Sequence, residues 1–162
     1  ELEEPIMSQV PFTFLFRVRY PECDAQQVEF NARYGDYTDL SIKEFKRALI
    51  GGYQTLVDIG VEIQVVRLLT EWQGPARYDD VICARVQAEH LGNTSYTLKV
   101  TFTHYETNQA IATSQATYVV VDAKTFKKTP IPEAFRAKLQ AGSPGVVINQ
   151  AGVISRITST EA

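Results

Sequence analysis

The stretch RYPECDAQQVEFNARYGDY, Arg19 to Tyr37, decides how this chain folds, because an extended segment ends in it and a helix begins in it. A tight turn usually contains Gly, Pro or Asn, and none of these lies between Asp24 and Phe30. The polar residues of the connection are Asp24, Gln26, Gln27 and Glu29. A connection of this composition calls for a reason other than turn formation, and Asp24 is its first candidate for a chemical role.

Upstream of this stretch, the apolar residues Phe12, Phe14, Phe16, Val18 and Tyr20 alternate with other residues. This period of two predicts a β-strand with one buried face, on which Tyr20 is the last residue. On this pattern alone, Tyr20 packs into the core.

Downstream, the period changes to that of a helix from Asn31 to about Ile50. One face carries Tyr34, Tyr37, Ser41, Phe45, Ala48 and Leu49, and the other carries Asp36, Asp39, Lys43, Lys46 and Arg47. Asn31 is a favourable N-cap, and the pair Gly51-Gly52 is a favourable stop. The pattern therefore predicts one amphipathic helix, with Lys46 on its solvent side.

Four strands follow the helix, and turn sequences separate them. We expect the strands at residues 61–72, 81–91, 94–105 and 110–122, followed by a short helix at residues 130–140. Residues 1–10 are interpreted as an N-terminal extension, residues 11–140 as one domain, and residues 141–162, rich in Gly, Ser and Thr, as a C-terminal tail. The order of strand, helix and consecutive strands predicts an α+β fold.

The chain has 162 residues, enough for one domain with its own hydrophobic core. Its net charge of −3 argues against nucleic acid as a partner. The two cysteines, Cys23 and Cys83, have no companion ligand spacing, which argues against a disulfide framework and a zinc site. Because no apolar run reaches the roughly 18 residues of a membrane span and no secretory signal is visible, we expect a cytoplasmic protein without a membrane span.

The predicted strands are more apolar than a sheet with one solvated face should be. Leu68, Leu69, Ile82 and Ala84 exemplify this excess. A second copy that covers or extends the sheet accounts for these residues, so we expect a homodimer or a tetramer built from dimers.

Three motifs occur in this chain in a fixed order. The first is Tyr20-x-x-x-Asp24, followed by Val28 and Ala32-x-Tyr34. The second is PARYDD at residues 75–80, and the third is VVVDAKTFKKTPIPEAF at residues 119–135. With the element order from residue 12 to residue 139, they resemble the hotdog-fold acyl-CoA thioesterases, in the branch of 4-hydroxybenzoyl-CoA thioesterase and the YbgC-type enzymes.

The resemblance implies a five-stranded antiparallel curved sheet wrapped around one long helix. It also implies hydrolysis of an acyl-CoA thioester, with Asp24 as general base or nucleophile. A helix N-terminus polarises a carbonyl, so we expect the backbone N–H of Asn31 to hold the oxyanion. Tyr20 matches a tyrosine near the active site of relatives, which implies a supporting role. Many relatives have Gly at position 27, an apolar residue at position 29 and often His at position 31, where this chain has Gln27, Glu29 and Asn31.

The substrate would also need contacts for its CoA phosphates, which Arg and Lys side chains provide. Arg77, Lys127 and Lys128 lie in the second and third motifs and are the candidates, while Gln26 is a candidate to orient water or substrate. No Gly-rich phosphate loop and no cluster of metal ligands is visible in the sequence, so we expect no metal and no cofactor beyond the CoA of the substrate.

Other functions remain open at this stage. Another hotdog branch carries its catalytic acid within the helix, where Asp39 and Glu44 lie on the polar side of this helix. Hydration or dehydration of an acyl thioester usually uses a His on that helix, and this helix has none. A non-catalytic acyl-binding protein and a thioesterase for acyl carrier protein are further alternatives, because a fold does not by itself define an activity.

Overall fold

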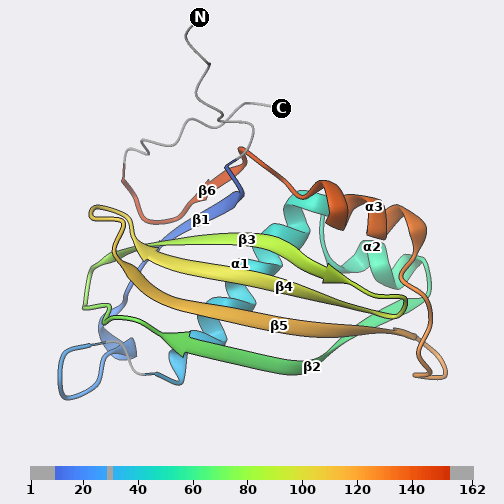
Figure 1. The fold of residues 1–162 in the computed structure, drawn as a ribbon, viewed down its shortest axis with the longest axis horizontal. Coiled ribbons are helices and arrows are strands. Elements are labelled where there is room, and N and C mark those ends of the chain that lie inside the picture. The colour runs from blue at the N-terminus through green and yellow to red at the C-terminus, as the bar shows by residue number, and fades with distance from the viewer. Residues whose placement is uncertain (1–9, 29–30, 154–162) are drawn as a thin grey trace, which may run out of the picture.

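The computed structural model describes residues 10–28 and 31–153 of the chain. It contains one six-stranded sheet in the order β2-β5-β4-β3-β1-β6, with the long helix α1 lying against one face (Figure 1). The elements are β1 (Phe12–Arg17), a 3-10 turn (Tyr20–Glu22), α1 (Arg33–Ile50), α2 (Tyr53–Asp58), β2 (Val61–Trp72), β3 (Val81–Leu91), β4 (Ser95–His104), β5 (Ala110–Asp122), α3 (Glu133–Ala141) and β6 (Val147–Asn149). The expected α+β class and the four strands after the helix are confirmed.

The sheet has six strands where we expected five. The additional strand, β6, pairs in parallel with β1, and Thr13 lies opposite Val147. It falls within residues 141–162, a segment whose Gly and Ser content suggested a tail. A strand of three residues is too short to show a periodicity, so the sequence pattern contained no signal for it.

Strand β1 is buried on both faces, which corrects the expectation of one buried face. Its residues Phe12, Phe14 and Phe16 join the main core. Leu15 points the other way and packs with residues that include Cys83 and Ala151. The second face is covered because the chain after α3 returns along β1, and the backbone N–H of Gln150 donates to the carbonyl of Leu15 at 2.8 Å.

Helix α1 fills the space beneath the sheet. Its buried residues are Tyr34, Tyr37, Thr38, Ser41, Ile42, Phe45 and Leu49. Ala48, which we placed on the apolar face, is exposed. The helix ends as expected at Gly51, whose positive φ of 82° suits glycine and whose N–H donates to the carbonyl of Arg47 at 2.9 Å. The short helix α2, which the sequence did not predict, follows directly.

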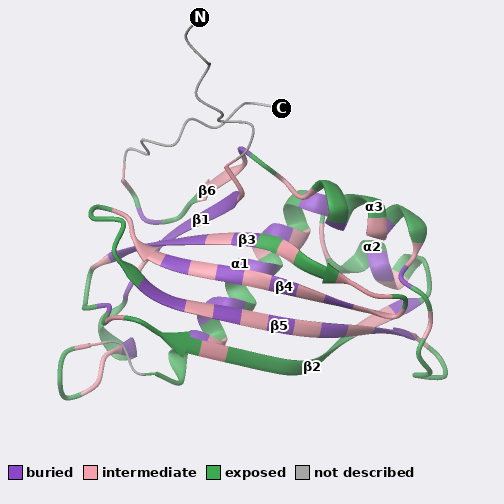
Figure 2. Ribbon diagram, viewed as in Figure 1, coloured by how far each residue is buried: buried purple, intermediate pink, exposed green. Residues whose placement is uncertain are grey.

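Strand β2 forms one edge of the sheet and is mostly exposed, as the green ribbon in Figure 2 shows. Its exposed apolar residues are Val65, Val66, Leu68, Leu69 and Trp72. Two residues that we expected on an uncovered face, Ile82 and Ala84 of β3, are fully buried in the core. The apolar excess is therefore concentrated on β2. Within the described part of the chain, no helix is both long and apolar enough to cross a membrane.

Candidate functional site

The N-terminal turn of α1 differs from the expected cap. The helix begins at Arg33, and Ala32 occupies the N-cap position without a side-chain capping hydrogen bond. Asn31 therefore does not cap the helix through its side chain, but its carbonyl accepts a hydrogen bond from the Tyr34 N–H at 3.3 Å. A helix start without a side-chain cap leaves backbone N–H groups that can polarise a ligand. Glu29 and Phe30, which complete this connection, lie outside the described residues.

Asp24 opens a tight turn that leads toward this helix start. Its Oδ1 accepts a hydrogen bond from the backbone N–H of Gln26 at 2.8 Å. The Gln27 N–H donates to the Asp24 carbonyl at 2.9 Å, and Gln27 adopts a positive φ of 62°. Position 27 is where many members of the resembling family have Gly, a residue that adopts positive φ without cost. The Asp24 carboxylate thus organises a turn that lacks the usual glycine.

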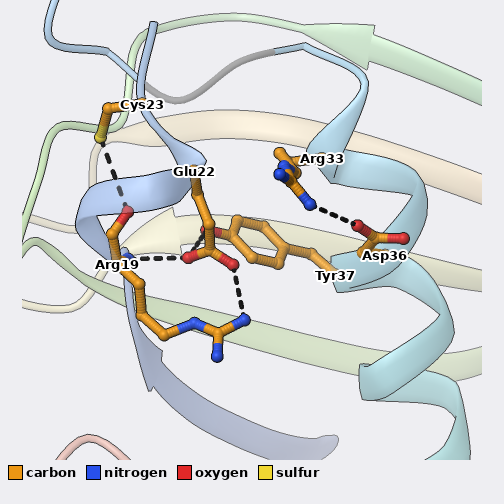
Figure 3. A network of polar contacts seen from close by, with 6 residues as sticks. All are labelled: Arg19, Glu22, Cys23, Arg33, Asp36 and Tyr37. Atoms are coloured by element: carbon orange, nitrogen blue, oxygen red, sulfur yellow. Dashed lines mark hydrogen bonds and ion pairs between the residues drawn. The ribbon is translucent and has the colours of Figure 1, made fainter.

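A buried carboxylate that the sequence analysis overlooked, Glu22, anchors this turn to α1. Its Oε1 accepts hydrogen bonds from the Tyr37 hydroxyl at 2.8 Å and from the Arg19 backbone N–H at 2.7 Å. Its Oε2 accepts from the Arg19 guanidinium at 3.0 Å (Figure 3). Burial by itself would raise the pKa of Glu22, but these hydrogen bonds outweigh burial and lower it. Glu22 is therefore held as a carboxylate with several partners.

This network limits the distance between Asp24 and α1. Tyr37 belongs to the second turn of α1, and its hydroxyl is bound to Glu22, two residues before Asp24. Two residues span at most about 7 Å, so the backbone of Asp24 lies within that distance of the residue whose side chain reaches Tyr37. The available sequence signal was the spacing of Arg19 and Glu22, which places opposite charges three residues apart.

Tyr20 is not a core residue. Its side chain is 77% exposed, because β1 ends at Arg17 and Tyr20 begins a 3-10 turn. Its ring meets the ring of Tyr78 edge to face, with centroids 5.9 Å apart. Strand alternation failed here because Pro21, which favours the start of such a turn, interrupts the extended chain. Tyr20 instead lies on the surface beside the second motif.

The structure brings the first and second motifs together. Val28 and Arg77 form an isolated antiparallel bridge, and the Asp79 N–H donates to the Val18 carbonyl at 2.9 Å. Arg77 is exposed, and its backbone N–H donates to Asp80 Oδ2 at 2.8 Å. Arg77 and the exposed Gln26 therefore lie in neighbouring segments at the same end of the molecule.

Lys127 and Lys128 lie at the other end of the sheet. Lys127 accepts a backbone hydrogen bond from Asp122, which is paired with Val61 at the start of β2. Arg77 follows the far end of β2, and a 12-residue strand is roughly 36 Å long. Within one chain, these lysines cannot contact the same substrate phosphates as Arg77.

The remaining candidates have structural partners. Asp39 is exposed and pairs with Lys43 at 2.8 Å, and Glu44 lies 3.8 Å from Arg47. His104, on β4, lies 3.6 Å from Asp80. Among residues 10–28 and 31–153, no group of three or more His, Cys, Asp or Glu side chains is arranged to hold a metal ion.

The sequence analysis also missed a groove between α1, α2 and the strands β2 and β5. It has a volume of about 510 Å³, and α2 closes one side of it. Lys46, which we assigned to the solvent side of α1, lies in this groove with its Nζ 4.3 Å from the ring centroid of Tyr118. Helical spacing alone could not reveal this, because the partner ring comes from a distant strand.

Comparison with known proteins assigns the family. A family model described as the thioesterase-like superfamily matches residues 18–139. A curated protein of Aquifex aeolicus, named as an esterase on a provisional basis, is 27% identical to this chain over 124 residues. The match covers 76% of this chain and 94% of the relative.

Two solved structures share the fold. The 1,4-dihydroxy-2-naphthoyl-CoA thioesterase from Synechocystis has a TM-score of 0.73 at 16% identity, covering 79% of this chain and 94% of that one. A thioesterase superfamily protein from Jannaschia has a TM-score of 0.75 at 21% identity, covering 88% of this chain and 99% of that one.

Proposed function

The chain belongs to the thioesterase-like superfamily, and from this premise we propose that it hydrolyses an acyl-CoA thioester to the free acid and CoA. The observation that carries the proposal is the Glu22–Tyr37 hydrogen bond, which tethers the Asp24 turn to the beginning of α1. This hydrogen bond limits how far the Asp24 carboxylate can lie from the positive end of the helix. A carboxylate and such a helix end are the two groups that hydrolysis of a thioester requires at neutral pH.

In the proposed reaction, the thioester carbonyl lies against the N-terminal turn of α1. As a general base, Asp24 removes a proton from a water molecule, whose oxygen attacks the carbonyl carbon. As a nucleophile, the Asp24 carboxylate attacks that carbon itself, and after the thiolate has left, water hydrolyses the acyl–aspartyl anhydride to the free acid and the Asp24 carboxylate. The carbonyl oxygen becomes an oxyanion, which the backbone N–H of Asn31 and the helix dipole stabilise. The carbon–sulfur bond then breaks, and the CoA thiolate leaves and takes up a proton.

CoA as the carrier of the acyl group is supported by one of the solved structures with this fold, which is a CoA thioesterase by name. Arg77 is an exposed cation beside the segment that carries Asp24, which suits a phosphate of CoA. Tyr20 and Gln26 are exposed at the same end of the molecule and are proposed to line the entrance to the site.

We propose that the active form is a homodimer in which two β2 strands pair at their edges. A long, apolar and exposed edge strand favours pairing with another strand. Around a two-fold axis the two β2 strands run antiparallel, so the start of one β2 lies beside the end of the other. Lys127 and Lys128 of the partner subunit would then approach the end that carries Arg77. In the dimer these lysines could contact the phosphates of CoA together with Arg77, which they cannot do within one chain.

The test is thiol release from short, long and aromatic acyl-CoAs by wild type and by Asp24→Asn. We expect turnover by wild type and a loss of about 100-fold or more in the variant, since a general base contributes about 10²–10⁴-fold. Asp58→Asn, the same change at an exposed aspartate at the end of α2, is the control and should retain most of the activity. Equal turnover by wild type and Asp24→Asn would remove Asp24 from the mechanism.

A single turnover in ¹⁸O-labelled water separates the two roles of Asp24. If the carboxylate is the nucleophile and water opens the anhydride at the aspartyl carbon, mass spectrometry will find the label in the peptide that contains Asp24. If it is a general base, the label will appear only in the released acid. No turnover on any acyl-CoA would contradict the proposed function and favour a binding protein.

A further inference from the structure

The groove between α1 and β2 combines apolar walls with a cation. Its walls include Ile42, Ile50, Leu56, Ile63, Val65 and Leu68. A volume of about 510 Å³ lies within the range of roughly 300–1,000 Å³ that is common for small-molecule sites. The apolar side chains come from both helices and from β2, so they would surround a ligand from several sides.

Three cationic side chains border this groove, and two of them have carboxylate partners. Lys43 pairs with Asp39 at 2.8 Å, and Arg47 lies 3.8 Å from Glu44. Lys46 makes no ion pair with any described residue, and its Nζ faces the rings of Tyr118 and Tyr96 at 4.3 and 5.9 Å. Lys46 is thus the cation of the groove that a ligand could neutralise.

The surroundings of Lys46 make an anion favourable there. Its ammonium is partly buried, and removal from water lowers its pKa to about 8, so it is mostly protonated at pH 7. The charged and titratable groups that act on it are Asp39 and Lys43 of α1, Tyr96 of β4 and Tyr118 of β5. Asp39 is already bound to Lys43 and offsets the burial only in part. A carboxylate from a ligand would supply the missing counter-charge.

We propose that this groove binds an aliphatic carboxylate, with its chain along the α1–β2 walls and its carboxylate on the Lys46 ammonium. An acyl chain matches the apolar walls, and the carboxylate matches the cation without a partner. The proposal does not depend on thioester hydrolysis, because the ligand is a free acid. If the proposed hydrolysis also occurs, its product belongs to this chemical class and would compete at the groove.

The experiment is calorimetric titration of the full chain with decanoate, below its micelle-forming concentration, at pH 7. The same titration with 1-decanol, the uncharged analogue, tests the apolar walls alone. Lys46→Met keeps an unbranched apolar side chain at this position but removes the charge. We expect this variant to bind decanoate at least tenfold more weakly than wild type and to bind decanol equally well. The matched control is Arg47→Met, which removes a paired cation from the same groove and should change affinity less than about twofold.

A pH series on the wild-type protein gives a second readout that does not depend on a variant. Decanoate affinity should be constant between pH 6 and 7 and should fall above about pH 8, as Lys46 loses its proton. Decanol affinity should not change over this range. No binding of decanoate to wild type, or equal affinity for wild type and Lys46→Met, would overturn the proposal. The first of these results is also expected if a second copy of the chain fills the groove.

Discussion

Two charged side chains packed against the interior behave in opposite ways. Glu22 is 5% exposed and has hydrogen-bond donors for both of its carboxylate oxygens. Lys46 is partly buried against aromatic rings and has no ion-pair partner among the described residues. Removing a partner from a buried charge is destabilising, and a buried charge that has no partner costs free energy. At the scale of the residue, this contrast separates a structural group from a binding group.

Tyr37→Phe should lower the free energy of unfolding by about 1–2 kcal/mol, because the hydrogen bond to the Glu22 carboxylate is lost while the ring still packs. Denaturant unfolding at pH 7 measures this. Tyr53→Phe, which removes a hydroxyl–carboxylate hydrogen bond to Glu62 at an exposed position, is the matched control and should cost less. An activity loss in Tyr37→Phe larger than its stability loss would indicate that the Asp24 turn has moved.

The Glu22 network also predicts a pH dependence. Its pKa in the folded protein lies below the ordinary value of 4.5, so the unfolded state binds the proton first as the pH falls. The stabilisation is complete above about pH 4.5 and is lost as the pH falls through the folded pKa. Glu22→Gln should therefore flatten the acid limb of a plot of stability against pH, relative to wild type. Parallel acid limbs in the two proteins would contradict this.

Lys46→Met should make the protein without ligand more stable by about 1 kcal/mol at pH 7. The variant no longer buries an ammonium group, which is favourable, but it also loses the cation–π contact with Tyr118, which offsets part of the gain. The folded pKa is about 8 and the ordinary value is 10.5, so between these pH values the unfolded state binds more protons. Wild-type stability should then rise from pH 8 to pH 10.5, and the variant should lack this rise. Thermal unfolding across that pH range measures both effects.

At the scale of the element, β1 depends on a segment that is far away in sequence. One face of β1 packs in the main core, and Leu15 on the other face is fully buried beneath the chain that contains β6 and Ala151. The Arg17 Nε adds a hydrogen bond to the Ala151 carbonyl at 2.6 Å. The segment after α3 therefore completes a second, smaller core rather than lying free on the surface.

Leu15→Ala should cost about 2–4 kcal/mol in the full chain, a typical value for a buried leucine. In a chain that ends at Gly145, which lacks β6 and Ala151, the same substitution should cost only about 1 kcal/mol, because Leu15 is no longer covered. The difference between the two costs measures the coupling between Leu15 and the C-terminal segment. Equal costs in both chains would mean that this segment does not bury Leu15.

At the scale of the whole molecule, the edge strand β2 is the feature that a single chain does not explain. It runs for 12 residues with exposed apolar side chains on both of its faces. Its inner face borders the groove, with Val65 and Leu68 opposite Tyr118 and Ala116 of β5. A dimer through this edge would extend the sheet and place the partner close to the open side of the groove.

Val66→Lys should dissociate the proposed dimer, because the middle of a strand that pairs with its own copy places two like charges near each other. Val66 is 59% exposed and does not line the groove, so the fold of the single chain should persist. Thr107→Lys, in the exposed turn between β4 and β5, is the control with the same charge. Sedimentation velocity that shows one unchanged species for wild type and both variants would contradict pairing through β2.

The sequence by itself determined the order of β1, α1, the four strands β2–β5 and α3, since periods of two and 3.6 residues are local properties of the chain, but it did not predict α2 or β6. It predicted the extent of β3 and β5, the end of α1 at Gly51, and the two motifs whose contact places Arg77 beside the Asp24 segment. It was wrong at the ends of elements, where the pattern of apolar residues does not show at which residue a strand stops or a helix begins. Tyr20 continues the alternation of β1 but lies in a 3-10 turn, and Asn31 has a capping side chain but does not cap α1.

Only the tertiary structure decided which charges are buried and what they meet. Glu22 gains its partner from α1, fifteen positions away, and Lys46 gains the ring of Tyr118 from β5. The strand β6 exists because β1 offers an unpaired edge, and its own three residues would not form a strand alone. Contacts between residues distant in sequence have no periodic signature, so a groove or a buried carboxylate emerges only when the sheet and the helix have come together.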